Sequence, residues 1–386
     1  MTEHQDLLQQ LVQVLQDSSI GDSFINPPPR GGRLTGEAEE NVERILESLR
    51  GIPTGRRHLA YGNGCFAIGC YSEAAAVYLE LLVEEPGNQV ARFNLGLAYS
   101  RLKRPEDAVK EFSQVLEAES GLAQAYYQRG NAYDDLTEPE IAIGDYETAI
   151  SLDPAYLRAH YNRGIVLAKV GRHQEAVDQF GKVIGLRPDL ANAYLNRGAS
   201  QDELGRHEQG IADYTEALRL DPDNVNARFN RARTYYYLDR VDDAIEDYTE
   251  VVRLRPDDAE AFNNRGLAFD SLRDYQRALE DYRVAASLQP DFAEVFNNRG
   301  AALEAMGDNE AAMAEYIAAA KAAPDFAVAY FNAARLCSKL GDLEQCLKNL
   351  QVAENLEPGW REEAAEDEHL SWVLELVELK EKKLND

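Results

Sequence analysis

Apolar residues recur along most of the chain at the spacing of amphipathic helices, and residues 157–190 show this pattern most clearly. In the first half of this stretch, Gly164 and Leu167 fall on one helix face. In the second half, Ala176 and Phe180 do the same. The pattern predicts two helices joined by a short turn. Such a hairpin is too small to bury its own apolar faces, so it requires a neighbour on each side.

The hairpin pattern repeats every 34 residues. Proline ends the second helix of each hairpin, because it lacks an N–H and disfavours helical conformation in the residue before it. These prolines share one position of the repeat: Pro86, Pro154, Pro188, Pro222, Pro256, Pro290, Pro324 and Pro358, with Ser120 in the remaining repeat. We therefore expect an all-α fold, a right-handed α-solenoid of about nine tandem 34-residue helix-turn-helix repeats over residues 55–360.

Small residues stand opposite bulky ones at a fixed offset in these repeats. With each repeat numbered from 1 to 34, position 8 is glycine or alanine throughout, as at Gly62 and Gly266. Position 24 is aromatic in every repeat except the last, which has Leu350. Small against large at fixed offsets is typical of closely packed helices. We expect the bulky residue to fill the space that the small one leaves.

Four segments flank the repeats. Residues 1–17 form a predicted N-terminal amphipathic helix, and residues 18–35 form a linker rich in Pro, Gly and Ser. Residues 36–54 are predicted to be an N-terminal capping helix, and residues 361–386 a C-terminal one. Capping helices are expected because the end repeats of a stacked array expose apolar faces.

The small, aromatic and proline positions at this period resemble the tetratricopeptide repeat family, and the resemblance covers residues 55–360. It implies that positions 2, 5, 6, 9, 12 and 13 face a concave groove. A helical net places these positions on one helix face. Tyr127, Tyr161, Phe229, Tyr236 and Tyr237 occupy such positions and offer the aromatic contact area that interfaces favour.

Position 6 carries an amide in eight repeats, although asparagine is an indifferent helix former. The row is similar to the NRG-type asparagine ladder in the superhelix of O-GlcNAc transferases, which implies binding to the backbone of an extended peptide. Two alternatives remain: inheritance from a founder repeat, or an internal bond between hairpins. The amides are Asn94, Gln128, Asn162, Asn196, Asn230, Asn264, Asn298 and Asn332.

Position 7 is arginine in repeats 3 to 8, and position 23 in five of these repeats is a carboxylate. The planar guanidinium fork can bind a carboxylate through two parallel hydrogen bonds. We therefore predict structural ion pairs between the two helices of a repeat, or across to the next repeat. Repeat 2, with Leu95 and Glu111, departs from this rule.

The formal net charge of −28 opposes binding to nucleic acid or anionic lipid. It indicates either a solvated surface or a preference for a basic partner segment. No stretch has the apolar length of a membrane span, and the first residues lack a signal-peptide pattern. We expect no membrane insertion and a cytoplasmic location. The cysteines are typical of buried packing residues.

The residues of the chain provide no catalytic constellation. The six histidines form no HExxH pair, and phosphate-loop, GxSxG and zinc-ligand spacings are missing. We therefore expect no enzyme activity, no cofactor and no metal site. Chaperone-binding family members hold a C-terminal carboxylate with basic residues at positions 5 and 6. Those residues are absent here, which argues against an Hsp70 or Hsp90 tail as partner.

The function we expect is that of a non-catalytic adaptor or assembly scaffold that binds an extended polypeptide segment in the concave groove. One alternative is an oligomeric structural scaffold (a homo-oligomer) that uses the convex face or the terminal helices. Another is a partner that recruits substrates in trans for an enzyme such as a glycosyltransferase.

Overall fold

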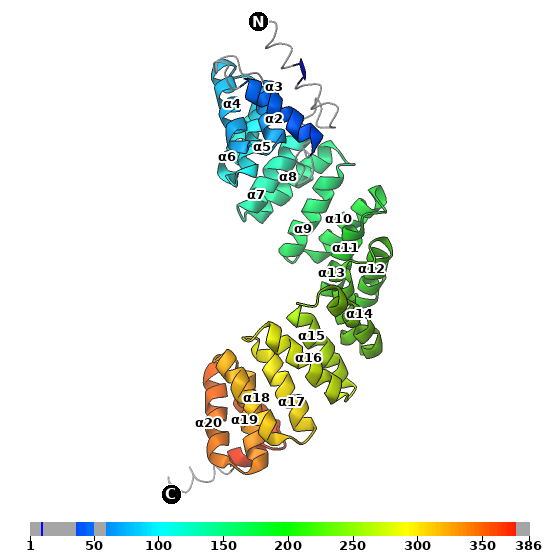
Figure 1. Ribbon diagram of the computed structural model, residues 1–386, viewed down its shortest axis with the longest axis vertical. Helices are drawn as coiled ribbons and strands as arrows, with labels where there is room; N and C mark the ends of the chain where they lie inside the picture. The colour runs from blue at the N-terminus through cyan, green and yellow to red at the C-terminus, as the bar shows by residue number, and fades with distance from the viewer. Residues whose placement is uncertain (1–8, 11–35, 50–58, 376–386) are drawn as a thin grey trace. The chain divides into compact units, whose positions relative to one another are not determined.

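The structure is a computed structural model that describes residues 9–10, 36–49 and 59–375. All regular elements in these ranges are helices (Figure 1). The predicted N-terminal helix, apart from residues 9–10, lies outside the described residues, as do the linker 18–35 and the last residues of the chain.

The predicted hairpins are confirmed, and each repeat contributes one first helix and one second helix. The first helices are α3 (Leu59–Ala67), α5 (Gln89–Arg101), α7 (Ala123–Asp135), α9 (Leu157–Lys169), α11 (Ala191–Glu203), α13 (Val225–Tyr237), α15 (Ala259–Ser271), α17 (Ala293–Ala305) and α19 (Ala327–Leu340). The second helices are α4 (Tyr71–Glu84), α6 (Pro105–Ala118), α8 (Pro139–Leu152), α10 (His173–Leu186), α12 (His207–Leu220), α14 (Val241–Leu254), α16 (Tyr275–Leu288), α18 (Asn309–Ala322) and α20 (Leu343–Leu356).

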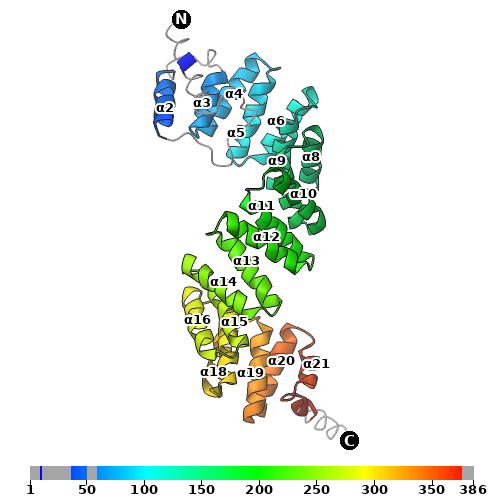
Figure 2. The ribbon, with the colours of Figure 1, turned by 90° about the vertical axis from the view of Figure 1, so that its right-hand side faces the viewer.

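The chain divides into two compact units, residues 1–204 and residues 205–386. In the first unit, each helix from α3 to α11 packs against the next along the chain, and the first helices α3, α5, α7, α9 and α11 also contact one another in order (Figure 2). The second unit repeats this arrangement, with α13, α15, α17 and α19 in succession. Each unit therefore has a continuous surface made of first helices.

The core of each hairpin depends on the contact between positions 8 and 24. A Cβ atom added to Gly62 would lie 2.6 Å from Cε1 of Tyr78, and one added to Gly266 would lie 2.6 Å from Cε1 of Tyr282. Both rings are fully buried. The two helices can approach this closely because glycine offers no side chain to the ring, so the predicted small-against-large packing is confirmed.

The turn between the two helices requires one left-handed residue, at position 15. Gly171, Gly205 and Gly341 have φ values of 78°, 72° and 83° there. Four repeats have other residues at this position, among them Thr137 with φ 60° and Lys103 with φ 58°. Left-handed backbone is costly for residues with a Cβ, and more so when the Cβ is branched.

Capping helices lie on the outermost repeat of each unit. Helix α2 (Glu37–Leu49) buries Val42, Ile45 and Leu46 against the first repeat. At the other end, α21 (Trp360–Glu366) follows α20, and the ring of Trp360 lies 4.6 Å from that of Phe331.

The C-terminal segment is not one continuous helix, which corrects the prediction for residues 361–386. Helix α21 ends at Glu366, and a turn precedes a second helical stretch that starts at Ser371. The Asp367 carboxylate accepts hydrogen bonds from the backbone N–H groups of His369 and Leu370, at 2.8 and 3.1 Å. Aspartate in this role begins a new helix rather than continuing the old one.

Three of the four cysteines are buried in the protein. Cys65, Cys337 and Cys346 are buried and Cys70 is exposed. Burial raises the pKa of the Cys346 thiol to about 11, so the thiol stays protonated near neutral pH. Within the described residues, no helix combines the length and the apolar character that crossing a bilayer requires.

We expect Thr137→Gly to stabilise the protein. The substitution removes a branched Cβ from left-handed backbone, a relief of about 1–2 kcal/mol, part of which is offset by the greater freedom of glycine in the unfolded chain. Thermal denaturation followed by circular dichroism should show a higher Tm. The matched control, Gly171→Thr at the same turn position, should lower it. A Tm that falls for Thr137→Gly would contradict this account of the turn.

Candidate functional site

Position 7 forms the predicted ion pairs between the two helices of a repeat. Arg129 donates through Nε and Nη2 to the two carboxylate oxygens of Asp145, both at 2.8 Å. These hydrogen bonds raise the pKa of Arg129. The same geometry, at 2.7 to 2.8 Å, pairs Arg231 with Asp247 and Arg265 with Asp281. Arg299 differs, because its Nη2 alone donates to both carboxylate oxygens of Glu315, at 2.6 Å.

Arg129 and Arg265 also contact the preceding repeat. Nη1 of Arg129 donates to Ser113 at 3.2 Å, and Nη1 of Arg265 donates to Thr249 at 3.3 Å. The Arg265 guanidinium also lies 5.6 Å from the centre of the Phe262 ring, within the range of a cation–π interaction. A single side chain therefore joins two helices of one repeat to a third helix of its neighbour.

Repeats without the full pair use substitutes. In repeat 2, Arg92 at position 4 supplies the cation, and its Nη1 lies 3.1 Å from Glu111. In repeat 4, Gln179 replaces the acid, and Arg163 instead lies 3.5 Å from Glu147 of the preceding repeat. The exception noted in the sequence is therefore a change of partner rather than a loss of the interaction.

The row of asparagines at position 6 joins neighbouring first helices. Asn162 Nδ2 donates to Tyr127 Oη at 3.2 Å, and Asn196 Nδ2 donates to Tyr161 Oη at 3.0 Å. In the second unit the acceptors are asparagines at position 5: Asn298 Nδ2 donates to Asn263 at 3.1 Å and Asn332 Nδ2 to Asn297 at 2.8 Å. These contacts match the alternative of an internal bond between hairpins.

The members of this row differ in accessibility. Asn94 is fully buried and donates to Asn63 at 3.0 Å, so its amide is enclosed by the protein. The other asparagines of the row are half-buried: Asn162, Asn196, Asn230, Asn264, Asn298 and Asn332. The asparagines at position 6 therefore have a structural role, and a ligand could reach only the exposed part of each half-buried amide.

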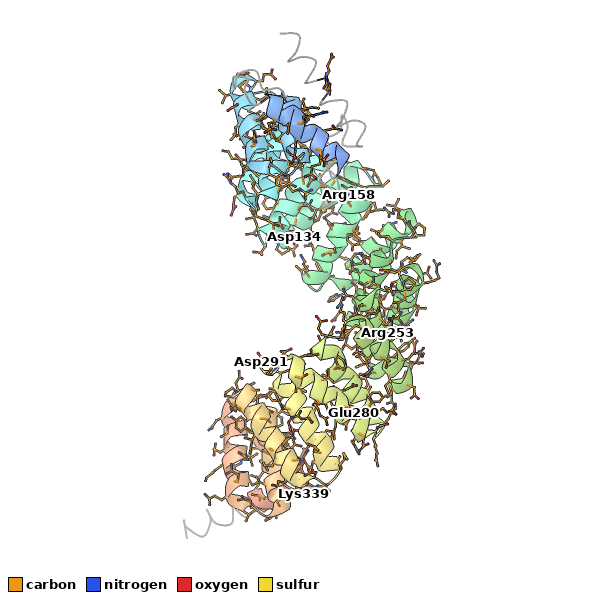
Figure 3. All side chains as sticks on the ribbon, viewed as in Figure 1. Asp134, Arg158, Arg253, Glu280, Asp291 and Lys339 are labelled. Carbon is orange, nitrogen blue, oxygen red and sulfur yellow. The ribbon has the colours of Figure 1, made fainter. Side chains whose placement is uncertain are left out.

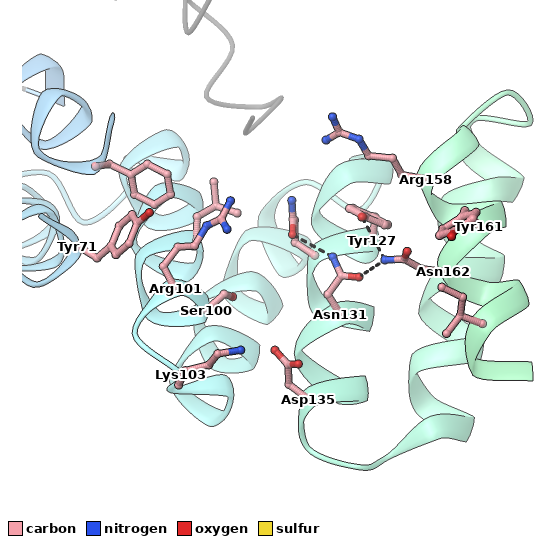
Figure 4. Close-up of a pocket in the computed structure, with 14 residues that line it drawn as sticks. Tyr71, Ser100, Arg101, Lys103, Tyr127, Asn131, Asp135, Arg158, Tyr161 and Asn162 are labelled. Atoms are coloured by element: carbon pink, nitrogen blue, oxygen red, sulfur yellow. Dashed lines mark hydrogen bonds between the residues drawn. The ribbon is translucent and has the colours of Figure 1, made fainter. Parts of the chain in front are cut away.

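A cavity of about 710 Å³ opens on the first helices of repeats 1 to 4 (Figure 4). It brings together three of the predicted site residues, Tyr127, Tyr161 and Asn162. Helices α5, α7 and α9 supply most of its lining, and nearly all lining residues occupy positions that the family resemblance assigned to the groove. The predicted groove surface thus exists in the first unit.

A chain of hydrogen bonds crosses this cavity. Asn131 Oδ1 accepts from Asn162 Nδ2 at 2.7 Å and from Tyr146 Oη at 2.9 Å, while Asn131 Nδ2 donates to Gln128 Oε1 at 3.2 Å. Tyr127 and Tyr161 accept from the asparagines of the following repeats. A phenol hydroxyl has one hydrogen of its own, so both tyrosines can still donate.

The remaining predicted aromatic residues lie in the second unit and do not share one described cavity. Phe229 is half-buried, and its ring packs edge to face on Tyr248 at 5.7 Å. Tyr236 is half-buried as well, and burial raises its pKa. Tyr237 is 72% exposed, and its ring lies 4.5 Å from that of His207.

Sequence reasoning missed the role of position 9. Asn63 and Asn131 each accept from the buried tyrosine of their own repeat, Tyr78 and Tyr146, at 2.9 Å. The sequence contains a pattern that could have predicted this hydrogen bond, because asparagine appears at position 9 only in repeats whose position 24 is tyrosine. Lys103 was also missed, since it lies in the turn rather than on the helix face.

A buried tyrosine hydroxyl needs a hydrogen-bond acceptor. Among the described residues, repeat 8 provides one for its tyrosine and repeat 7 does not. Tyr316 Oη donates to Glu304 at 3.0 Å. At the corresponding positions of repeat 7, Tyr282 Oη and Asp270 Oδ1 are both buried and have no hydrogen-bond partner among the described residues. Aspartate is one methylene shorter than glutamate. Burial raises the pKa of both Asp270 and Tyr282.

Some charged groove positions elsewhere form ion pairs. Lys169 Nζ lies 3.2 Å from Asp134 in the first unit. In the second unit Glu304 contacts both Arg335 and Lys339, at 3.7 and 3.5 Å. Within the described residues no group of three or more His, Cys, Asp or Glu side chains is arranged to hold a metal ion.

Models described as tetratricopeptide repeat match residues 66–124, 127–191, 191–224, 229–291 and 293–326. The C-terminal part of a TPR repeat-containing protein from Cytophaga hutchinsonii has a similar structure, with a TM-score of 0.55 and 16% identity over 62% of this chain and 99% of that one. That likeness shows the fold alone. No curated protein matches the sequence.

Two other solved structures overlap shorter parts of the chain. YrrB, described as a TPR protein with an unusual peptide-binding site, is 24% identical over 52% of this chain and 99% of its own, with a TM-score of 0.44. MamA from Desulfovibrio magneticus RS-1 is 24% identical over 44% of this chain and 97% of its own, with a TM-score of 0.43.

Arg265→Ala should destabilise the protein strongly. It leaves the buried Asp281 carboxylate without its partner, which typically costs about 3–5 kcal/mol. Urea denaturation of the full chain measures the change. The control is Arg253→Ala, which removes an exposed pair with Glu250 (Figure 3) and should change the free energy of unfolding by less than about 1 kcal/mol. Equal effects of the two substitutions would show that the row of arginines is not structural.

Asp270→Glu should raise the free energy of unfolding by about 1 kcal/mol, because the longer side chain can accept from Tyr282. Tyr282→Phe should be nearly neutral, whereas Tyr316→Phe should destabilise.

The pH dependence of stability gives an independent check. Because the folded-state pKa of Asp270 is raised, its destabilising effect is absent below the unfolded-state pKa and complete above the folded-state pKa. Asp270→Asn should remove that part of the pH profile. A profile that is unchanged in Asp270→Asn would contradict the assignment.

Proposed function

Because the chain belongs to the tetratricopeptide repeat family, we propose that it is a protein-interaction adaptor that binds an extended polypeptide segment on the first helices of repeats 1 to 4. The observation that carries this proposal is the cavity of about 710 Å³ with its aromatic and amide lining. An open surface made of several parallel helices suits a segment that runs across them, rather than a compact small molecule.

Particular residues would make the contacts. Tyr127 is 8% exposed and Tyr161 is half-buried, so both rings are held by packing and lose little freedom when a ligand binds. Gln128 and Asn162 present amide edges to the same cavity. Asn94 is not among the contact residues, because it is fully buried. Asn196, Asn230, Asn264, Asn298 and Asn332 stay predictions, as do the aromatic residues of the second unit.

A second candidate function is self-association through a different surface. A groove of about 360 Å³ lies between α18, α19 and α20, and it is lined mostly by apolar side chains. At its edges Ile317 and Leu340 are 60% and 54% exposed. Exposed apolar area of this kind favours contact with another protein surface. Sedimentation of the full chain would detect self-association, which substitutions in the cavity of repeats 1 to 4 should leave unchanged.

Selection from a random peptide display library tests the adaptor proposal. We expect the full chain to select peptides, and Gln128→Ala/Tyr161→Ala to lose them. The matched control is Ile141→Ala/Gln174→Ala, which changes exposed residues of α8 and α10 and should retain binding.

Melting curves must accompany this comparison, because the Tyr161 ring packs on Phe180 at 5.9 Å. Gln128→Ala alone removes no aromatic ring, only the acceptor of one hydrogen bond from Asn131, and provides a second variant should the double variant fail to fold. Selected peptides that bind the Gln128 and Tyr161 variants as tightly as the unsubstituted chain would contradict the proposed site.

A further inference from the structure

The cavity of repeats 1 to 4 departs from the charge of the chain as a whole. The chain carries a formal net charge of −28. Among the described residues, the cavity is lined by three cations, Arg101, Lys103 and Arg158, and by one carboxylate, Asp135. Lys169 and Asp134 nearby form a pair and add no net charge. The site of the proposed function is therefore locally basic on an acidic protein.

The cations lie on both sides of the hydrogen-bonded amides. Arg101 and Lys103 come from the end of α5 and the turn after it, and Arg158 comes from the start of α9. Figure 4 shows Arg158 on the opposite side of Asn131 and Asn162 from Lys103. A segment that crosses the amides would thus meet positive charge on either side.

The direction of the internal hydrogen bonds adds to this polarity. Asn162 Nδ2 and Asn131 Nδ2 are both used inside the protein, on Asn131, Tyr127 and Gln128. The groups that these bonds leave for a ligand include the hydroxyl hydrogens of Tyr127 and Tyr161 and the Nε2 hydrogens of Gln128. These hydrogens, together with the cations, suit a ligand that offers acceptors.

Resting on the proposed function, we propose that the cavity of repeats 1 to 4 binds an acidic segment, whose Asp or Glu carboxylates accept from the tyrosine hydroxyls and pair with Lys103 and Arg158. Ionised carboxylates have acceptors only, so they match the positive charge of the site and the hydrogens that its tyrosines and Gln128 offer. This reverses the preference for a basic partner that the net charge of the whole chain had suggested. The local field, rather than the total charge, acts on a segment within a Debye length of the cavity.

Fluorescence anisotropy with labelled peptides of known sequence tests the proposal. The probe is a short peptide of alternating Gly, Leu and Glu, compared with counterparts in which Gln or Lys replaces Glu. The full chain should bind the Glu peptide, bind the other two more weakly, and lose affinity for the Glu peptide as salt is added.

Charge reversal locates the binding site. Lys103→Glu/Arg158→Glu should weaken binding of the Glu peptide about tenfold. Lys110→Glu/Arg187→Glu changes the net charge by the same amount at exposed residues of the same unit, outside the cavity, and should leave the affinity nearly unchanged. Arg158→Gln alone is the milder variant if the double reversal does not fold.

The outcomes separate this inference from the proposed function. If the Gln or Lys peptide binds more tightly, and Gln128→Ala/Tyr161→Ala abolishes that binding, the acidic preference is wrong and the groove site stands. If Lys103→Glu/Arg158→Glu and Lys110→Glu/Arg187→Glu weaken binding of the Glu peptide equally, the net charge of the protein rather than the cavity determines the affinity, and the inference is wrong. If the Gln128 and Tyr161 substitutions change the binding of none of the selected peptides, both the proposed function and this inference are wrong.

Discussion

The close approach of the two helices in each hairpin is the constraint on which the rest of the structure depends. A glycine on the first helix lies against an aromatic ring of the second so closely that a methyl group would overlap the ring, as at Gly62 and Gly266. With the helices held at this distance, Arg265 at position 7 can reach the Asp281 carboxylate at position 23 with two of its nitrogens, Nε and Nη2. The steric contact thus sets the geometry that the electrostatic contact uses.

The same spacing explains why the groove face has its particular chemistry. Neighbouring first helices lie near enough for an asparagine amide to reach the tyrosine or asparagine of the preceding repeat. Those bonds use the amide hydrogens inside the protein. Consequently the row of asparagines supports the surface, and the groups that we propose to bind a ligand are the tyrosine hydroxyls, the Gln128 amide and the cations around them.

Much of this could be predicted from the sequence, because repetition makes packing positions visible. Gly266 and Tyr282 recur in register with their equivalents, and the covariation of Arg265 with Asp281 predicted a contact that the structure confirms. The direction of the asparagine bonds could not be predicted, because it depends on distances between helices of different repeats. The break at Asp367 was missed because the apolar spacing continues through it, although the carboxylate caps a new helix.

The local charge of the cavity could not be predicted from the composition of the chain, for a related reason. Arg101, Lys103 and Arg158 hold three different positions in two repeats, so no single column of the repeat contains them. Only folding brings them to one cavity. A total charge of −28 therefore gave no guide to the field at the site.

The most direct test is an NMR titration of the side-chain amide signals of the full chain with the Glu peptide. The account predicts that the Gln128 and Asn131 amide signals shift while the Asn94 signal stays, because Asn94 is fully buried. Shifts confined to amides of the second unit, or no amide shifts at saturating peptide, would contradict it.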